Sequence, residues 1–343
     1  MGGSAFNMAA HGFVTSRMDV AQYQTLSNLV LPLVRLYFCN VAVPPEAPGK
    51  TSYGDLDIFV SKPLNLHHHE AILQLCTNAL GTRCKRFIYS VGTSNIAVEL
   101  DGEMFQVDVH VVERKEIWDI DFWMHSYGDT GMIVSSILKN WKLRLSASRG
   151  LWVEIAECPS KPFVLSLDME RIATFVGLDW RRYQEGFHTT ADLFQWIEGV
   201  TLDGKRVGVK AKGKLEKKSH DDRPMWFAFW SRGEDAAYEP TEEEQKIVFG
   251  QAVDYFGKRE ELETVLFEFA RNKAAKEKLN GVRVMAWTGA KGRALGDLMK
   301  TLKSDARLNK GALMAMSLDE VQKIVLEVWG NFCIRKSVGV SPV

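Results

Sequence analysis

The stretch Gly54-Asp55-Leu56-Asp57-Ile58-Phe59-Val60 indicates both how this chain folds and where its chemistry lies. Side chains alternate between the two faces of a strand, so Asp55 and Asp57 share one face and the apolar residues between and after them lie on the other. Two carboxylates held this close repel each other, and the pKa of one of them rises unless a cation lies between them. We therefore expect a hard divalent ion, Mg²⁺ or Mn²⁺, beside this strand.

A third carboxylate lies in the apolar segment Phe105–Val111. Alternation places Asp108 on the face opposite to Phe105, Val107, Val109 and Val111. If this strand pairs beside the first, Asp108 joins Asp55 and Asp57. Three such carboxylates can hold two metal ions about 3.5 to 4 Å apart, which clamp the attacking and leaving oxygens of a phosphoryl displacement. Asp55, Asp57 and Asp108 are the predicted metal ligands and catalytic residues.

The loop before the acidic strand has a composition that suits a triphosphate. Its sequence, Gly49-Lys50-Thr51-Ser52-Tyr53-Gly54, supplies backbone amides, hydroxyls and one cation. Glycines let amide groups approach phosphate oxygens, and a lysine offsets their charge. The predicted nucleotide-binding residues here are Gly49, Lys50, Ser52, Tyr53 and Gly54.

Hydrophobic periodicity predicts the elements on either side of this loop. Apolar residues at helical spacing predict helices over 23–38 and 67–80, and proline and glycine predict a stiff loop over 41–50. Strands are predicted over 55–60, 86–91, 96–100 and 105–112. The fold class expected from this order is α+β with a mixed sheet.

The rest of the chain is predicted to form further segments. Helices are expected over 132–145 and 167–176, the second capped by Ser166, with a strand over 151–155 between them. Seven basic residues and one acid lie between Lys205 and Lys218, which indicates an exposed basic linker, and capping-box patterns at Thr241 and Ser317 predict helices. The expected division is 1–122 as the catalytic domain, 123–200 as a small α+β domain, 201–240 as the linker and 241–343 as a helical C-terminal domain.

The succession of helix, glycine-containing loop, Gly-Asp-x-Asp strand and separate strand with a third Asp resembles the nucleotidyltransferase superfamily of DNA polymerase beta, over roughly residues 23–112. The opening residues 1–6 look like the start of polymerase-beta-like proteins from fungi and large viruses. The resemblance implies a palm domain that transfers a nucleotide from an NTP or dNTP to a hydroxyl and releases pyrophosphate. It also implies that Asp55 and Asp57 hold both ions, and that Asp108 holds the catalytic ion and helps to deprotonate the acceptor.

The resemblance extends to 125–151, which is similar to the segment that packs against the incoming nucleotide, and it implies that Tyr127 and Gly128 lie near the sugar and base. The chain departs from the family at the end of the first helix. The usual Gly-Ser pair is replaced by the stretch 39–42, in which Asn40 could donate a hydrogen bond in place of the serine, and prolines stand where an arginine is expected. With about 50 residues before the acidic strand, the resemblance does not include a helix-hairpin-helix lyase region.

Composition limits the alternatives. With 43 Lys+Arg against 43 Asp+Glu and 46% hydrophobic residues, the chain is not of a disordered, collagen-like or coiled-coil class. Its five cysteines include no CxxC pair, which argues against a disulfide framework or a zinc ribbon. No apolar run is long enough to predict a membrane span, so we expect a soluble, intracellular protein of the nucleus or cytoplasm rather than the mitochondrion.

The expected partners are a nucleoside triphosphate and a DNA or RNA acceptor. The basic segment with Trp226, Phe227 and Trp230 beside it could bind and stack on nucleic acid, or the aromatic residues could belong to a core. The competing hypothesis is a nucleic-acid-binding protein on a catalytically impaired nucleotidyltransferase fold. Transfer to a protein or a small molecule is a third possibility, and the oligomeric state is open.

Overall fold

The structure, a computed structural model, describes residues 5–6, 14–64, 66–90, 92–159, 161–206, 223–232 and 239–337. The chain folds into two compact units. The first comprises Met1–Val153 with Pro162–Phe256, and the second comprises Glu154–Lys161 with Gly257–Val343. The first unit is α+β and contains a mixed sheet, and the second is helical, as expected from the sequence. The predicted division into four segments is finer than this and stays a prediction.

The central feature of the first unit is a five-stranded sheet with the order β1-β2-β5-β4-β3. Its strands β2 and β5 are parallel neighbours, whereas the other neighbouring pairs are antiparallel. The strands are β1 (Phe38–Ala42), β2 (Asp55–Pro63), β3 (Cys84–Ile88), β4 (Thr93–Leu100) and β5 (Glu103–Val111).

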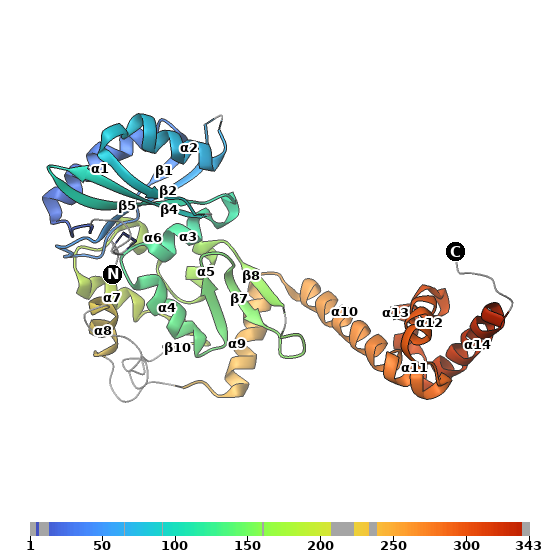
Figure 1. Ribbon diagram of the computed structural model, residues 1–343. Coiled ribbons are helices and arrows are strands. Elements are labelled where there is room, and N and C mark those ends of the chain that lie inside the picture. The colour runs from blue at the N-terminus through green and yellow to red at the C-terminus, as the bar shows by residue number, and fades with distance from the viewer. Residues whose placement is uncertain are drawn as a thin grey trace. The chain divides into compact units, whose positions relative to one another are not determined.

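Helices cover one face of this sheet. Helix α1 (Val20–Val34) begins with a capping box formed by Asp19 and Gln22. Helix α2 (His68–Gln74) continues into a π-helical turn, η2 (Leu75–Ala79), and a 3₁₀ turn, η3 (Gly81–Arg83). Figure 1 shows α1 and α2 on the same side of the sheet. Leu56, Ile58 and Val60 of β2 are fully buried beneath them, and each contributes about 1.5–3 kcal/mol.

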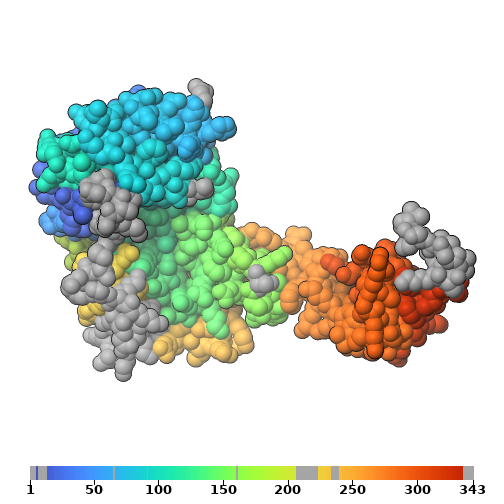
Figure 2. Space-filling view, in the orientation of Figure 1, coloured from blue at the N-terminus to red at the C-terminus, as the bar shows by residue number. Residues whose placement is uncertain are grey.

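The remainder of the first unit lies against the five-stranded sheet, as the adjoining blue and green regions of Figure 2 show. It contains a second sheet of order β6-β7-β8 and a two-stranded sheet of β9 and β10. Its elements are η4 (Lys115–Ile117), α3 (Trp118–His125), α4 (Thr130–Lys139), β6 (Leu143–Ser146), β7 (Gly150–Glu154), β8 (Pro162–Ser166), α5 (Met169–Phe175), α6 (Trp180–Glu185), α7 (Thr190–Ile197), β9 (Thr201–Leu202), β10 (Lys205–Arg206), α8 (Pro224–Trp230) and α9 (Glu242–Tyr255).

The second unit is a helical bundle with its own core. Val284, Leu298 and Val325 are fully buried at its centre. Its helices are α10 (Arg259–Lys278), α11 (Gly281–Thr288), α12 (Gly292–Ser304), η6 (Ala306–Leu308), α13 (Lys310–Ala315) and α14 (Leu318–Ser337). The predicted capping boxes at Thr241 and Ser317 are both confirmed. Glu244 and Glu320, three residues after the respective caps, are their partners at the N3 position.

Several predicted boundaries are wrong. The first helix ends at Val34, and the residues that follow form strand β1 on the edge of the sheet, so 38–42 belong neither to a helix nor to a loop. The helix predicted over 132–145 ends at Lys139, because the chain turns at Lys142, which has a φ of 58°, before it enters β6. Of the strand predicted over 86–91, residue 91 lies outside the described residues.

The predicted cap of the helix near residue 167 is also wrong. Asp168 caps α5 by accepting a hydrogen bond from the Arg171 amide. Ser166 ends β8, and its hydroxyl accepts a hydrogen bond from the Asp168 amide instead. A side chain two residues upstream thus supports the cap without forming it.

Candidate metal centre

Three carboxylates converge on the sheet face opposite to the core helices. The parallel register of β2 and β5 sets Asp57 directly beside Asp108, with Asp55 one alternation back on the same face. Oxygen atoms of Asp55, Asp57 and Asp108 all lie within 4.8 Å of one another, and this is the one group of three or more metal-ligating side chains among the described residues. The prediction that the three acids lie close together is therefore confirmed.

Asp108 is the most enclosed of the three. Its carboxylate accepts hydrogen bonds from Asn95 Nδ2 on β4 (2.7 Å to Oδ1) and from Gln106 Nε2 on its own strand (2.9 Å to Oδ1 and 3.0 Å to Oδ2). Burial raises the pKa of Asp108, the charge of Asp57 raises it further, and the two amide donors lower it in part. Because Oδ1 already accepts two bonds, Oδ2 keeps the greater capacity for another ligand.

Asp57 is held by a histidine that the sequence patterns do not single out. His110 Nε2 lies 2.8 Å from Asp57 Oδ1, and a carboxylate can only accept, so Nε2 carries the proton. The Thr93 hydroxyl lies 2.9 Å from His110 Nδ1 and donates to it when the ring is neutral. Phe59 stacks on the same imidazole with ring centroids 4.7 Å apart. These contacts fix the ring and leave the second oxygen of Asp57 available to the cluster.

The donor set suits a hard cation. Three carboxylates offer oxygen ligands, which Mg²⁺ and Mn²⁺ prefer, and neutral amides rather than cations supply the described hydrogen bonds to Asp108. Oxygen atoms within 4.8 Å of one another are close enough to serve as ligands of one ion or of a shared pair of ions.

The loop before β2 contains a left-handed turn at one of its glycines. Gly49 adopts a φ of 75°, and Gly54 is buried at the bend that enters the strand. Lys50 Nζ forms an ion pair with Glu46 at 2.5 Å and lies 4.9 Å from the centroid of the Tyr53 ring. A phosphate would therefore compete with Glu46 for the lysine.

Tyr53 is held in place by contacts with the rest of the protein. Its ring stacks on Tyr23 with centroids 4.2 Å apart, and its hydroxyl donates to the Lys50 carbonyl. Its backbone pairs with Met18 in an antiparallel bridge, which ties the loop to the chain before α1. The tyrosine is buried, so its contribution to ligand binding is confined to its backbone and ring edge.

Ser52 binds the side chain of Arg17. Arg17 Nε donates to Ser52 Oγ at 2.8 Å, and Arg17 Nη2 donates to the Ser52 carbonyl at 2.9 Å. Arg17 is exposed, and its bonds to Ser52 add a second cation to this loop. Its only sequence signal is that it is one of the few charges in the first 20 residues.

The prediction for Asn40 is wrong in its location. Asn40 lies in β1 opposite Ser61, whose hydroxyl accepts a hydrogen bond from Asn40 Nδ2 at 2.8 Å. Ser61 lies four residues beyond Asp57 on β2, or about 13 Å along the strand. Since the residue is in an edge strand rather than at a helix end, the sheet places it away from the acidic cluster.

Tyr127 and Gly128 contact the loop that precedes the acidic strand. The Tyr127 amide donates to the Pro45 carbonyl at 2.6 Å, and a Cβ on Gly128 would lie 3.2 Å from the Ala47 Cβ. The Tyr127 ring makes edge contacts with Tyr183 and Phe187 and is 8% exposed. Only a small part of it is available to a ligand in this structure, and its role beside a sugar and base stays a prediction.

The segment predicted to stack on nucleic acid is part of a core. Trp226 and Trp230 of α8 are buried, so the stacking hypothesis is wrong for these two rings. Asp129 positions α8 by accepting hydrogen bonds from Arg223 Nη1 at 2.7 Å and from the Trp226 amide at 3.2 Å. Of the basic stretch, Lys205 and Arg206 form β10, and 207–222 lie outside the described residues.

Comparison with known proteins yields no assignment: neither the protein-family models nor the curated proteins include a match to this chain. None of the helices in the described part of the chain combines the length and hydrophobicity needed to span a bilayer.

Proposed function

We propose that this protein is a metal-dependent nucleotidyltransferase of the DNA polymerase beta type. It transfers a nucleotide from an NTP or dNTP to a hydroxyl acceptor, the 3′ end of DNA or RNA, and releases pyrophosphate. The observation that carries the proposal is the set of oxygen atoms of Asp55, Asp57 and Asp108 within 4.8 Å, on two parallel neighbouring strands.

The three carboxylates would hold two Mg²⁺ or Mn²⁺ ions. Such ions, when bound, polarise the phosphoryl group and stabilise the negative charge of the attacking and leaving oxygens. Asp55 and Asp57 share one face of β2, where both can contribute to the same pair of ions. His110 holds Asp57 in a single rotamer through its Nε2–H, so the ligand is positioned before substrate binds.

Asp108 would accept the proton of the attacking hydroxyl. Its pKa is raised by burial and by the charge of Asp57, which brings the carboxylate closer to the basicity that a general base requires. Asn95 and Gln106 orient it from two sides. Gly49, Gly54 and the backbone between them would line the triphosphate, with Lys50 and Arg17 as the cations nearest to it.

The test is nucleotide incorporation by the purified full-length protein. It is mixed with Mg²⁺ or Mn²⁺, each labelled NTP and dNTP in turn, and a short DNA or RNA primer. We expect primer extension and pyrophosphate release that fall to background in Asp57→Asn and persist in Asp101→Asn, an exposed acid in the turn between β4 and β5 of the same sheet. Incorporation that survives Asp57→Asn would contradict the proposed ligand set.

Two contacts favour the competing hypothesis of an impaired transferase fold that binds nucleic acid. Lys50 is engaged by Glu46, and one oxygen of Asp57 is engaged by His110. On this hypothesis the protein binds labelled DNA or RNA in a gel-shift assay with the same affinity in Asp57→Asn, and no nucleotide is incorporated. Repeating the assay with protein and small-molecule hydroxyl acceptors distinguishes both from transfer to another substrate class.

A further inference from the structure

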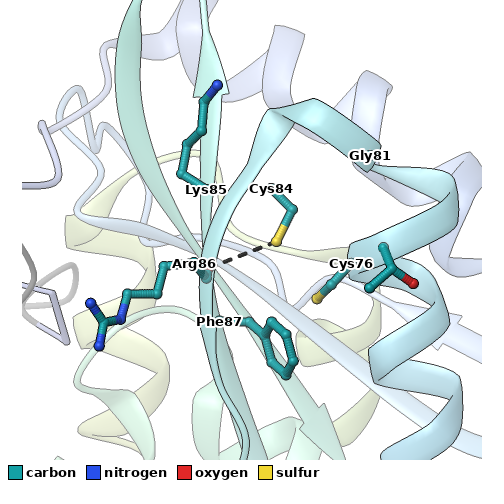
Figure 3. Close-up of a pocket in the computed structure, with 7 residues that line it drawn as sticks. Cys76, Gly81, Cys84, Lys85, Arg86 and Phe87 are labelled. Atoms are coloured by element: carbon teal, nitrogen blue, oxygen red, sulfur yellow. Dashed lines mark hydrogen bonds between the residues drawn. The ribbon is translucent and has the colours of Figure 1, made fainter.

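Two cysteines meet at the edge of the five-stranded sheet, on the face covered by helices. Cys76 of η2 and Cys84 of β3 line a pocket of about 440 Å³, together with Gly81 and Phe87. Figure 3 shows both sulfur atoms in the space between the helical segment and the strand. Both cysteines pack against the same hydrophobic cluster, and the interaction between their thiols raises the pKa of Cys76 and lowers that of Cys84.

Two irregularities of the backbone bring these side chains together. Cys76 lies in a π-helical turn that interrupts the end of α2, and Cys84 lies at a break in the register between β3 and β4. Both kinds of irregularity turn side chains out of the direction that a regular element would give them, and both are frequent at functional sites. Figure 3 shows the Cys84 sulfur pointing toward the Arg86 carbonyl, from which it lies 3.8 Å.

The two sulfurs differ in access and in acidity. Cys76 is 2% exposed, whereas Cys84 is half-buried and opens to the pocket. The hydrogen bond from Cys76 lowers the pKa of Cys84, while the same bond and burial raise the pKa of Cys76. One member of the pair is therefore the accessible nucleophile, and the other is a buried thiol within reach of it, which is the arrangement of a reactive cysteine beside a resolving one.

We propose that Cys76 and Cys84 form a reversible disulfide when the protein is oxidised by hydrogen peroxide, with Cys84 as the thiol that is oxidised first. The Cys84 thiolate attacks one peroxide oxygen, the O–O bond breaks, and hydroxide leaves as water after protonation, so Cys84 becomes a sulfenic acid. Cys76 sulfur then attacks the Cys84 sulfur, the S–O bond breaks, and a second water leaves. Two thiols and one peroxide give one disulfide and two waters, and the thiols supply both electrons and both protons.

Both side chains line the same pocket, so a bond between the sulfurs needs a rearrangement of these two side chains rather than of the sheet. The pair lies on the helix-covered face of the sheet, whereas the acidic cluster lies on the other face with β5 and β4 between β2 and β3. The proposal thus concerns a site distinct from the metal centre, and it stands whether or not nucleotidyl transfer is found.

The experiment is peptide mapping of the reduced full-length protein after treatment with hydrogen peroxide and alkylation of the remaining thiols. We expect a cross-linked peptide pair that joins Cys76 to Cys84, two hydrogens lighter than the free peptides and restored by dithiothreitol. Its formation should be at least tenfold faster than loss of the thiol of Cys158, which is buried. Oxidation that consumes other cysteines and leaves this pair reduced, or that stops at a sulfinic acid on Cys84 without a cross-link, would overturn the proposal.

Single variants test the order of attack. Cys76→Ser should accumulate a sulfenic acid on Cys84 that reacts with dimedone, whereas Cys84→Ser should give no sulfenic acid on Cys76. Equal dimedone labelling of the two variants would refute the assignment of Cys84 as the thiol that reacts with the peroxide. Cys158→Ser is the matched control and should cross-link like the unaltered protein. The mapping of the unaltered protein decides the main proposal even where a variant folds poorly.

Discussion

Asp57→Asn tests the charge balance of the acidic cluster most directly, because it removes one charge and keeps the shape of the side chain. In the metal-free protein, two unit charges at the upper limit of 4.8 Å would repel by about 3.5 kcal/mol at an effective dielectric of about 20, and by about 1 kcal/mol in bulk water. The Asp57 side chain is 37% exposed, so solvent screens both of its pairs, with Asp55 and Asp108, and we expect each pair to lie near the bulk-water value. The amide oxygen of the variant can still accept the hydrogen bond from His110.

The expected result is a metal-free protein that is more stable by about 2 kcal/mol, which raises the Tm by about 4–8 °C for a unit of this size. In the unaltered protein, Mg²⁺ at about ten times its Kd should add about 1.4 kcal/mol, and the variant should lose most of this gain. The assay is thermal unfolding followed by calorimetry at pH 8, with EDTA or with Mg²⁺, since burial raises the pKa of Asp108 and the cluster must be fully ionised.

Asp101→Asn is the control, because it changes the same charge in an exposed turn of the same sheet. Its Tm should stay within about 1–2 °C of the unaltered protein in both buffers. A metal-free Tm that falls in Asp57→Asn, or an equal response to Mg²⁺ in both proteins, would refute the reasoning that repulsion among these acids is relieved by a divalent ion.

Three further changes test the surroundings of the site and the fold. Asn95→Ala removes a donor that lowers the pKa of Asp108, so that pKa rises and Mg²⁺ binding should require a higher pH than in the unaltered protein. The measurement is isothermal titration calorimetry across pH, and an unchanged pH dependence would contradict the role of Asn95. Gly150→Ala places a Cβ 2.2 Å from the Ser166 carbonyl oxygen at a φ of 65°, and it should lower the free energy of unfolding in urea by about 4 kcal/mol or more. The control is Gly204→Ala, which has a similar φ but open space around it and should lower this free energy by only about 1–2 kcal/mol. Equal losses would show that the contact with β8 relaxes freely. Asp129→Ala removes the acceptor of the Arg223 and Trp226 hydrogen bonds and should destabilise the protein by about 2–4 kcal/mol in the same measurement, with a loss below 1 kcal/mol counting against a positioning role for this buried carboxylate.

Local patterns in the sequence determine much of the site. Alternation along a strand is a property of backbone geometry, so it places Asp55 and Asp57 on one face and Leu56 and Ile58 on the other without knowledge of the neighbours. The same holds for the capping boxes, because each is a hydrogen-bonded exchange between residues three positions apart. The order of the helices and strands from α1 to β5 was therefore predictable except for the edge strand β1, whereas several elements after residue 112, such as α3, β6 and α7, were not predicted.

The tertiary structure decided which strands became neighbours. A strand has two edges, and long-range packing selected β5, in parallel register, as the partner that sets Asp108 beside Asp57. The same strand pairing places His110 beside Asp57 and Asn95 beside Asp108, although neither residue belongs to a distinctive local sequence pattern. It also placed 38–42 in an edge strand, so Asn40 lies opposite Ser61 and not at the end of a helix.

Contacts between segments distant in sequence follow the same rule. Arg17 reaches Ser52 across 35 residues, and Cys76 reaches Cys84 through a π-helical turn and a register shift that no periodicity encodes. The physical reason is that side-chain alternation and capping depend on bonds within one segment, whereas strand partners, register and backbone irregularities are settled by the free energy of packing the whole unit.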